Sequence, residues 1–195
     1  MSKDQLMQEL RQSIIDKKVA VDLAAGAKNL VMGDGNLNAE IVLIGEAPGK
    51  NEDETGLPFV GAAGKFLDEM LVAAELDRKS VYITNIVKYR PPSNRDPLPS
   101  EKAEFWPYLM RQLEIINPKA IITLGRHSGA NFIPDLHIST DHGKARMVKY
   151  HDREWLVIPL YHPAAALYNG GMRQTLIDDF IGAYDLVKNQ AKLDS

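Results

Sequence analysis

Cysteine is absent from the 195-residue sequence. Without thiols, the chain cannot form a disulfide, a thiolate nucleophile, a thiolate zinc site or a cysteine-ligated iron–sulfur cluster. Long apolar runs are also absent, so the sequence predicts no membrane-spanning helix and no membrane partner. The N-terminal segment is charged and amphipathic, and it lacks the apolar centre of a secretory signal. We therefore expect a cytoplasmic protein.

An excess of positive charge is lacking too, because the formal net charge is −3. Contact with nucleic acid would therefore have to come from local basic patches. The remaining composition is ordinary for a globular protein, with 45% hydrophobic and 25% charged residues. The length suits one domain spanning residues 1–195, which we expect to be a monomer.

Short apolar segments alternate with segments of helical periodicity along the chain. The predicted strands are 40–44, 81–87, 120–124 and 155–160. The predicted helices are 4–17, 65–75, 101–116 and 173–188, while 18–38 is expected to be irregular and 134–154 a long loop with a hairpin. Such alternation is typical of a parallel sheet with helices on both faces. The predicted fold is therefore α/β, with three α/β/α layers around a central four-stranded, mainly parallel sheet.

Carboxylates gather directly after the first predicted strand. Segment 41–59 reads IVLIGEAPGKNEDETGLPF, and it passes from a buried strand into a turn containing Glu46, Glu52 and Asp53. Ligands of open α/β sheets bind at the carboxyl ends of strands. Clustered carboxylates there can activate a water or bind a divalent metal, although a solvated acidic turn fits the spacing equally well. A metal-dependent hydrolase that uses Glu52, Asp53 and Glu54 as ligands is one hypothesis.

Three further side chains suit recognition of a nucleobase, namely Phe59 in a glycine-rich loop, Asn85 within the apolar strand 81–87 and His162 at the end of the last predicted strand. Phe59 could be a stacking platform, although a lone aromatic residue more often fills a core. The amide of Asn85 presents a donor and an acceptor side by side, and it could equally bridge backbone groups. His162 could donate a hydrogen bond to a leaving group, or it could be structural.

Basic and small residues in the loops could contact DNA. Lys88, Arg90 and Arg95 lie in a proline-rich loop and could bind phosphates, although basic loops are usually only solvated. The small-residue segment from Ala164 to Leu167 could wedge into the base stack of DNA, or it could simply begin a helix.

Several motifs together resemble the uracil-DNA glycosylase superfamily, most closely its family 4, over roughly residues 28–185. They are GEAPGKNEDETGLPFVGAAGKFLD (45–68), TNIVKYRPPSNRDPLPSE (84–101), PYLMRQ (107–112), ITLGR (122–126) and YHPAAAL (161–167) with Arg173 downstream. The resemblance implies a monofunctional DNA N-glycosidase that flips uracil out of DNA and hydrolyses its glycosidic bond, as in base excision repair. Uracil-containing DNA is then the substrate and free uracil a product, with no cofactor in the chemistry. A non-catalytic member of the fold that binds uracil-containing or single-stranded DNA is the alternative.

The resemblance also implies roles for the matched positions. Phe59 corresponds to the stacking residue, Asn85 to the reader of the uracil amide edge, and His162 to the group that stabilises the uracil O2. Glu46 and Glu52 correspond to the motif acids, and the choice between them for orienting the water stays open. The remaining matched positions are Gly45 and Ala47 in the substrate-binding motif, Leu167 as the wedge, and Ala164 and Arg173 in contact with DNA.

One departure from family 4 concerns its 4Fe–4S cluster, which is held by four cysteines. Two of the matched positions are Tyr89 and Phe105, and the other two fall near Lys18 and Val21. None is cysteine, so we expect no cluster and predict that Tyr89 and Phe105 fill the vacated volume. A related branch bonds the freed sugar through a histidine in an altered loop near the proline-rich segment. That segment reads PPSNRDP here and contains no histidine, which disfavours this outcome.

Overall fold

A six-stranded sheet in the order β1-β3-β2-β4-β6-β5 forms the centre of the protein. The computed structural model describes residues 1–193. The strands are β1 (Asp34–Gly35), β2 (Ile41–Gly45), β3 (Tyr82–Asn85), β4 (Ala120–Leu124), β5 (Arg146–Tyr150) and β6 (Arg153–Leu160). The inner four, β3-β2-β4-β6, run parallel and correspond to the four predicted strands. Two antiparallel edge strands, β1 and β5, extend this predicted core to six.

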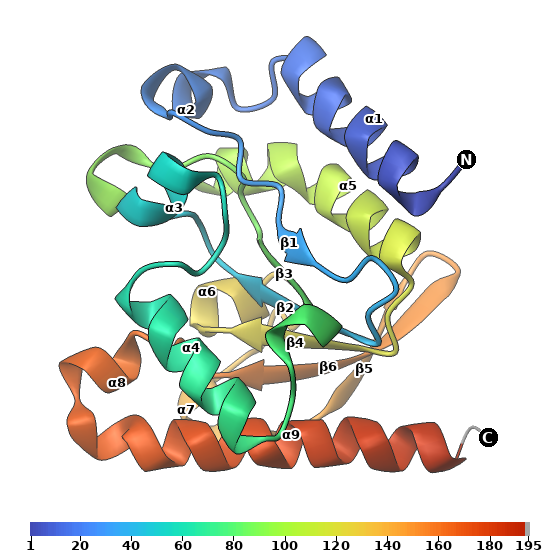
Figure 1. Ribbon diagram of the computed structural model, residues 1–195, viewed down its shortest axis with the longest axis vertical. Coiled ribbons are helices and arrows are strands. Elements are labelled where there is room, and N and C mark those ends of the chain that lie inside the picture. Colours follow the sequence, from blue (N-terminus) through green and yellow to red (C-terminus); the bar gives the residue numbers. More distant parts are fainter. Residues whose placement is uncertain (194–195) are drawn as a thin grey trace.

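The helices lie on both faces of the sheet, as predicted (Figure 1). They are α1 (Lys3–Asp16), α2 (Val21–Gly26), α3 (Lys50–Thr55), α4 (Ala62–Ala73), α5 (Pro99–Ile116), α6 (Arg126–Gly129), α7 (Ile138–Asp141), α8 (Ala165–Tyr168) and α9 (Arg173–Leu193). Short 3-10 turns occupy Arg78–Ser80, Pro92–Asn94 and Gly170–Met172. Helices α1 and α5 pack together over one face, and α4 and α9 pack together over the other. The layers are therefore α/β/α.

Strand β2 shows how the sequence builds two cores from one sheet. All five of its residues are buried. Val42 and Ile44 point into the core beneath α1 and α5, whereas Ile41 and Leu43 point into the core beneath α4 and α9. Successive side chains of a strand face opposite sides, so a continuous apolar run serves both layers. Each fully buried aliphatic side chain of this kind contributes about 1.5–3 kcal/mol.

The edge strands fall in segments where the sequence predicted little regular structure. Strand β5 pairs with β6 in the segment that was expected to contain a hairpin. Its burial alternates between partly buried and exposed, as suits a strand covered on one face only. Strand β1 is two residues long and lies, with α2, in the segment 18–38 that was predicted to be irregular. Gly35 of β1 has φ +122°, and a Cβ at that position would overlap the Val81 carbonyl.

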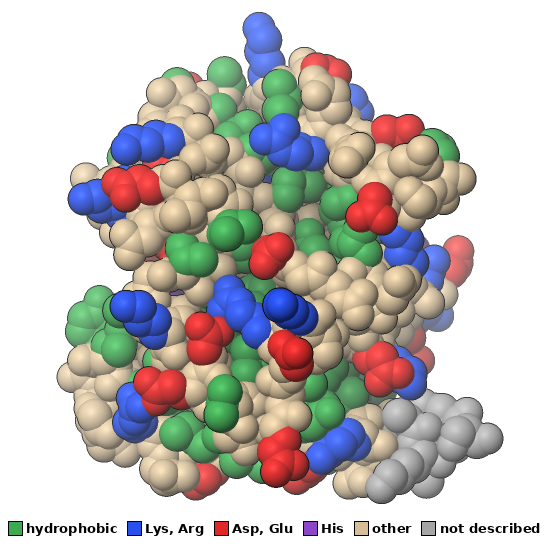
Figure 2. Space-filling model, in the orientation of Figure 1, with side chains coloured by type: hydrophobic (Ala, Val, Ile, Leu, Met, Phe, Trp, Pro, Cys, Tyr) green, Lys and Arg blue, Asp and Glu red, His purple; other side chains and the backbone are tan. Residues whose placement is uncertain are grey.

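Charges of both signs are distributed over the surface. On the face shown in Figure 2, Lys and Arg side chains are interspersed with Asp and Glu and do not form one continuous basic area. This arrangement agrees with the slightly negative net charge. Within residues 1–193, no helix combines the length and the apolar character needed to cross a membrane.

Candidate active site

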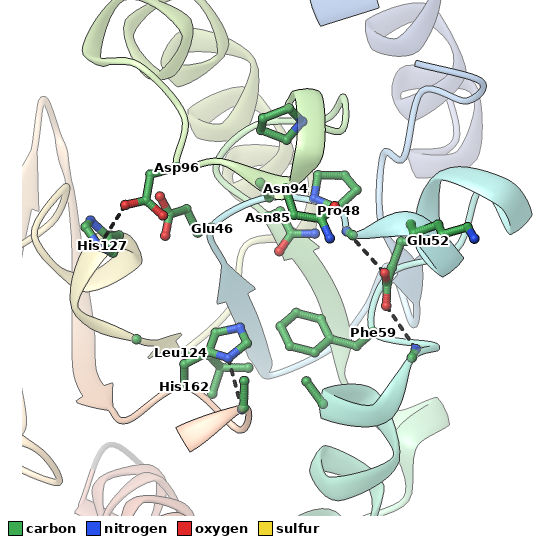
Figure 3. Close-up of a pocket in the computed structure, with 18 of the residues that line it drawn as sticks. Glu46, Pro48, Glu52, Phe59, Asn85, Asn94, Asp96, Leu124, His127 and His162 are labelled. Carbon is green, nitrogen blue, oxygen red and sulfur yellow. Dashed lines mark hydrogen bonds and ion pairs between the residues drawn. The ribbon is translucent and has the colours of Figure 1, made fainter. Parts of the chain in front are cut away.

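A cavity of about 630 Å³ opens where the parallel strands β2, β3, β4 and β6 end. Its walls come from the segments that follow these strands and from α8 (Figure 3). Most of the residues predicted for the site line this cavity, namely Glu46, Ala47, Glu52, Phe59, Asn85, Arg95, His162, Ala164 and Leu167. The sequence therefore predicted the location of the pocket correctly from the rule that ligands bind at the carboxyl ends of strands.

Phe59 forms one wall of the pocket, in a backbone conformation that two glycines make possible. Its φ is +50°, which is unusual for a residue with a side chain. A Cβ on Gly64 would overlap the Phe59 carbonyl, so the chain can pass this closely only at a glycine. A Cβ on Gly45 would lie 2.6 Å from the Phe59 ring. The ring is held flat against the end of β2 and stacks on the His162 ring with a centroid distance of 5.8 Å.

Asn85 is the last residue of β3, and its side chain is 2% exposed. Its Oδ1 is buried and accepts no hydrogen bond within the described part of the chain. A buried acceptor without a donor costs about 1–3 kcal/mol. Gly45 again makes room, since a Cβ there would lie 2.4 Å from this oxygen. This oxygen is therefore a buried acceptor at the wall of the cavity that could take a hydrogen bond from a bound molecule.

Lys88 corrects one prediction, because it cannot contact DNA phosphates. The residue is 0% exposed, and its Nζ donates to Thr84 Oγ1 at 2.6 Å and to the Asn85 carbonyl at 2.7 Å. Burial lowers the pKa of Lys88 well below its ordinary value. Two of its N–H donors are used in these bonds. Lys88 thus fastens the turn that follows Asn85 from inside the protein.

His162 follows β6 directly, and the backbone determines its tautomer. The Ala164 N–H donates to His162 Nδ1 at 3.1 Å, so Nδ1 is the acceptor and Nε2 carries the hydrogen (Figure 3). Burial lowers the pKa of His162 to about 4, although the charge of Glu52 acts in the opposite direction. At neutral pH the residue is therefore an uncharged imidazole that can donate a hydrogen bond into the pocket.

The two glutamates have different surroundings. Both carboxylate oxygens of Glu52 accept backbone hydrogen bonds, from Gly49 at 3.1 Å and from Val60 and Gly61 at 2.9 and 3.0 Å. These bonds join the start of α3 to the Phe59 segment. Glu46 instead has a buried Oε1 without a partner within residues 1–193, and burial raises its pKa. Glu46 is therefore available to a bound water, whereas Glu52 is committed to the loop.

The acidic turn is folded into α3 and does not offer a metal site. Asp53 is buried and accepts hydrogen bonds from the backbone N–H groups of Lys28 and Asn29. Glu54 lies 3.7 Å from Lys28 Nζ at the surface. The hypothesis of metal binding by Glu52, Asp53 and Glu54 is therefore wrong. Within residues 1–193, the one group whose ligand atoms approach within 4.8 Å of one another is Glu46, Asp96 and His127.

The other basic residues predicted to contact DNA lie in different surroundings. Arg95 lines the pocket and is paired with Glu101 at 2.6 Å. Arg90 donates to Asn94 Oδ1 at 2.7 Å and lies outside the lining. Arg173 starts α9, where its guanidinium lies 4.7 Å from the centre of the Phe66 ring and forms an ion pair with Glu69.

Sequence analysis missed several residues that line the cavity. Lys50 and Arg126 are exposed cations on its rim, and Asp96 and His127 lie beside Glu46. Tyr168 borders the mouth next to Leu167. The signal for these cations was their place in the segments that follow β2 and β4, since Lys50 begins α3 after β2 and Arg126 begins α6 after β4. No sequence feature indicated that Tyr168 would line the pocket.

The positions that correspond to the cluster ligands do not fit an iron–sulfur cluster. Tyr89 and Phe105 are buried in the core beneath α1 and α5, and their rings meet edge to face with centroids 5.8 Å apart. Val19 and Ala20 belong to the same core. None of these side chains is a thiolate, which is the ligand that holds the iron of such clusters. The prediction that Tyr89 and Phe105 pack together in this volume is confirmed.

Comparison with known proteins gives concordant matches over most of the chain. The sequence model of the uracil DNA glycosylase superfamily matches residues 32–183. A type-4 uracil-DNA glycosylase of Sulfurisphaera tokodaii is 51% identical over 78% of this chain and 72% of its own length. One from Archaeoglobus fulgidus is 49% identical over 82% of each chain. One from Thermotoga maritima is 37% identical over 97% of this chain and 98% of its own.

Proposed function

Since this chain belongs to the uracil DNA glycosylase superfamily, we propose that it is a uracil-DNA glycosylase that cleaves the bond between uracil and deoxyribose in DNA. The products are free uracil and an abasic site. This cleavage is the first step of base excision repair. A nucleobase inside a duplex is covered by its neighbours, so the uridine must rotate out of the stack to enter the cavity. The pocket opens to the surface at the carboxyl ends of the inner strands, and this position supports the route.

The unpartnered amide oxygen of Asn85 is the observation that carries the proposal. Uracil presents an N3–H donor beside its O4 acceptor, which complements an amide oxygen and an amide N–H. The N3–H of a uracil stacked on Phe59 would supply the donor that the buried Oδ1 of Asn85 lacks. Cytosine has an acceptor at N3, so it would leave both groups unpaired, at a cost of about 1–3 kcal/mol. The site therefore favours uracil over the normal base from which it arises.

Charge development on the departing base explains the role of His162. As the glycosidic bond breaks, its electron pair remains on uracil while the sugar becomes cationic. The Nε2–H of His162 can donate to the uracil O2, where negative charge accumulates. A neutral donor with a fixed tautomer needs no reorganisation during the reaction, which makes it effective in a water-poor site. The Ala164 N–H that holds Nδ1 supports this role.

Glu46 is the carboxylate that we assign to the water. One O–H bond of the water breaks, its oxygen bonds to C1′ of the sugar, and the proton passes to Glu46. A carboxylate near C1′ also stabilises the cationic sugar. The unpartnered Oε1 of Glu46 supports this choice, whereas the three backbone hydrogen bonds that Glu52 accepts support a role in shaping the loop.

The proposal is tested with oligonucleotides that contain one uracil, in single- and double-stranded form. Incubation followed by alkali should break the strand at uracil and should leave matched thymine and cytosine oligonucleotides intact. Excess chelator should not change the rate, because no metal takes part in the steps above. Binding of uracil DNA without any strand break would contradict the proposal and favour the non-catalytic alternative.

A further inference from the structure

The tip of α8 presents two exposed hydrophobic side chains at the mouth of the pocket. Leu167 is 50% exposed and Tyr168 is 91% exposed. Tyr168 has the most exposed large hydrophobic side chain of the described residues. Both residues line the cavity, together with Ala164. Adjacent exposed hydrophobic side chains at the mouth of a pocket are typical of a surface that contacts a ligand or partner.

The backbone holds this tip in one conformation. The N–H of Tyr168 donates to the Ala164 carbonyl, and the N–H of Asn169 donates to the Ala165 carbonyl. Ala166, in the same turn, is buried and packs in the core beneath α4 and α9. Within residues 1–193 the Tyr168 ring stacks on no other aromatic ring. A fixed backbone therefore presents an aromatic face that has no ring partner within the protein.

Exposed cations complete the rim of the pocket. Lys50 begins α3 and Arg126 begins α6, and both line the same cavity as Tyr168. Neither forms an ion pair within the described residues. A rim with both an aromatic face and unpaired cations has the two elements that bind a nucleic acid strand, stacking for bases and charge for phosphates.

We propose that Tyr168 stacks on the nucleobase adjacent to the flipped uridine. This inference rests on the proposed function, because it requires a uridine in the pocket. Every base has an aromatic face, so the contact binds flanking bases without reading their identity. It also gives the enzyme a hold on single-stranded DNA, in which no opposite base supports the stack.

A double-mutant cycle tests this proposal by removing the Tyr168 side chain, the neighbouring base, or both. The probes are oligonucleotides with one non-cleavable 2′-fluorodeoxyuridine, with the 5′ or the 3′ neighbour either intact or replaced by a baseless tetrahydrofuran spacer. Affinities for the parent protein and Tyr168→Ala are measured by fluorescence anisotropy. With both neighbours intact, the substitution should weaken binding about tenfold. With the stacked neighbour removed, it should change affinity less than about twofold, and Tyr168→Trp should retain the parent's affinity.

Two controls make the outcome specific. Met147→Ala removes another exposed side chain, on β5 and outside the pocket lining, and it should bind every probe as the parent does. Equal affinities of Tyr168→Ala and the parent, or the same loss on all probes, would overturn the inference. Cleavage of uracil DNA by the parent is assayed separately. Failure of that cleavage would refute the proposed function, whereas cleavage without coupling at either neighbour would refute only the role of Tyr168.

Discussion

Replacement of His162 by asparagine should remove a pH dependence of stability that this one residue produces. Burial lowers the pKa of His162 from 6.5 to about 4 in the folded protein. The unfolded chain therefore binds this proton more readily than the folded chain does. The folded state has its full stability above about pH 6.5, and it loses stability as the pH falls from there towards about 4. The direction is that of a buried base, and it is opposite to that of an ion-paired histidine.

The magnitude follows from the separation of the two pKa values. Each pH unit between them corresponds to about 1.4 kcal/mol of unfolding free energy. From about pH 7.5 to about pH 4.5, the complete linkage for His162 would be about 2.5 kcal/mol. The ring is only partly covered by the protein, and screening by solvent reduces the expected effect to about 2 kcal/mol. An asparagine at this position would have no proton to bind and should not contribute to this loss.

Urea unfolding of the parent and of His162→Asn at both pH values measures the effect. The quantity to compare is the loss of unfolding free energy on acidification, because every other titrating group is common to the two proteins. The parent should lose about 2 kcal/mol more than the variant. Nitrogen NMR of the parent at neutral pH should also show hydrogen on Nε2. Equal losses in the two proteins, or a doubly protonated ring near pH 6, would refute the assignment of a neutral buried imidazole.

Four other substitutions probe the remaining walls of the pocket. Gly45→Ala would place a Cβ against the Asn85 amide and the Phe59 ring, so kcat/KM on uracil DNA should fall about 100-fold or more while circular dichroism stays unchanged. Asn85→Asp should reduce uracil cleavage and narrow the preference for uracil over cytosine, and unchanged ratios would exclude Asn85 as the reader. Glu46→Gln should slow single-turnover cleavage about 100-fold or more with DNA affinity retained, whereas Glu52→Gln should lower the unfolding free energy by about 1–3 kcal/mol. The opposite pattern for the two glutamates would reverse their roles.

The central sheet and the position of the site were readable from the sequence because they depend on local patterns. A run such as Ile41–Ile44 can be buried on both faces only in a covered parallel sheet. His162 follows one such run and Asn85 lies within another, and the parallel topology brings the carboxyl ends of β3 and β6 to the same side of the sheet. The location of these two residues at the pocket was therefore predictable from the sequence.

Other features depend on contacts that no local pattern encodes. Lys88 follows two apolar residues in a basic, proline-rich segment, and nothing nearby in the sequence indicates that its amine points inward to Thr84. The different hydrogen bonding of Glu46 and Glu52 depends on which backbone N–H groups lie close to each carboxylate after folding. The same holds for the approach of Asp96 and His127 to Glu46, because the three residues come from three separate loops. Such partnerships are tertiary, so spacing along the chain cannot reveal them.

The absence of cluster ligands leaves the pocket intact because other contacts anchor the same segments. The Ala20 N–H, beside the matched N-terminal positions, donates to Glu104 Oε2 of α5 at 2.7 Å. Tyr89 and Phe105 close the volume between the proline-rich loop and α5 with buried rings. Lys88, next to Tyr89, holds the Asn85 carbonyl from the interior side. Apolar packing and hydrogen bonds thus connect the N-terminal segment, α5 and the end of β3, and the position of the Asn85 amide does not depend on a metal centre.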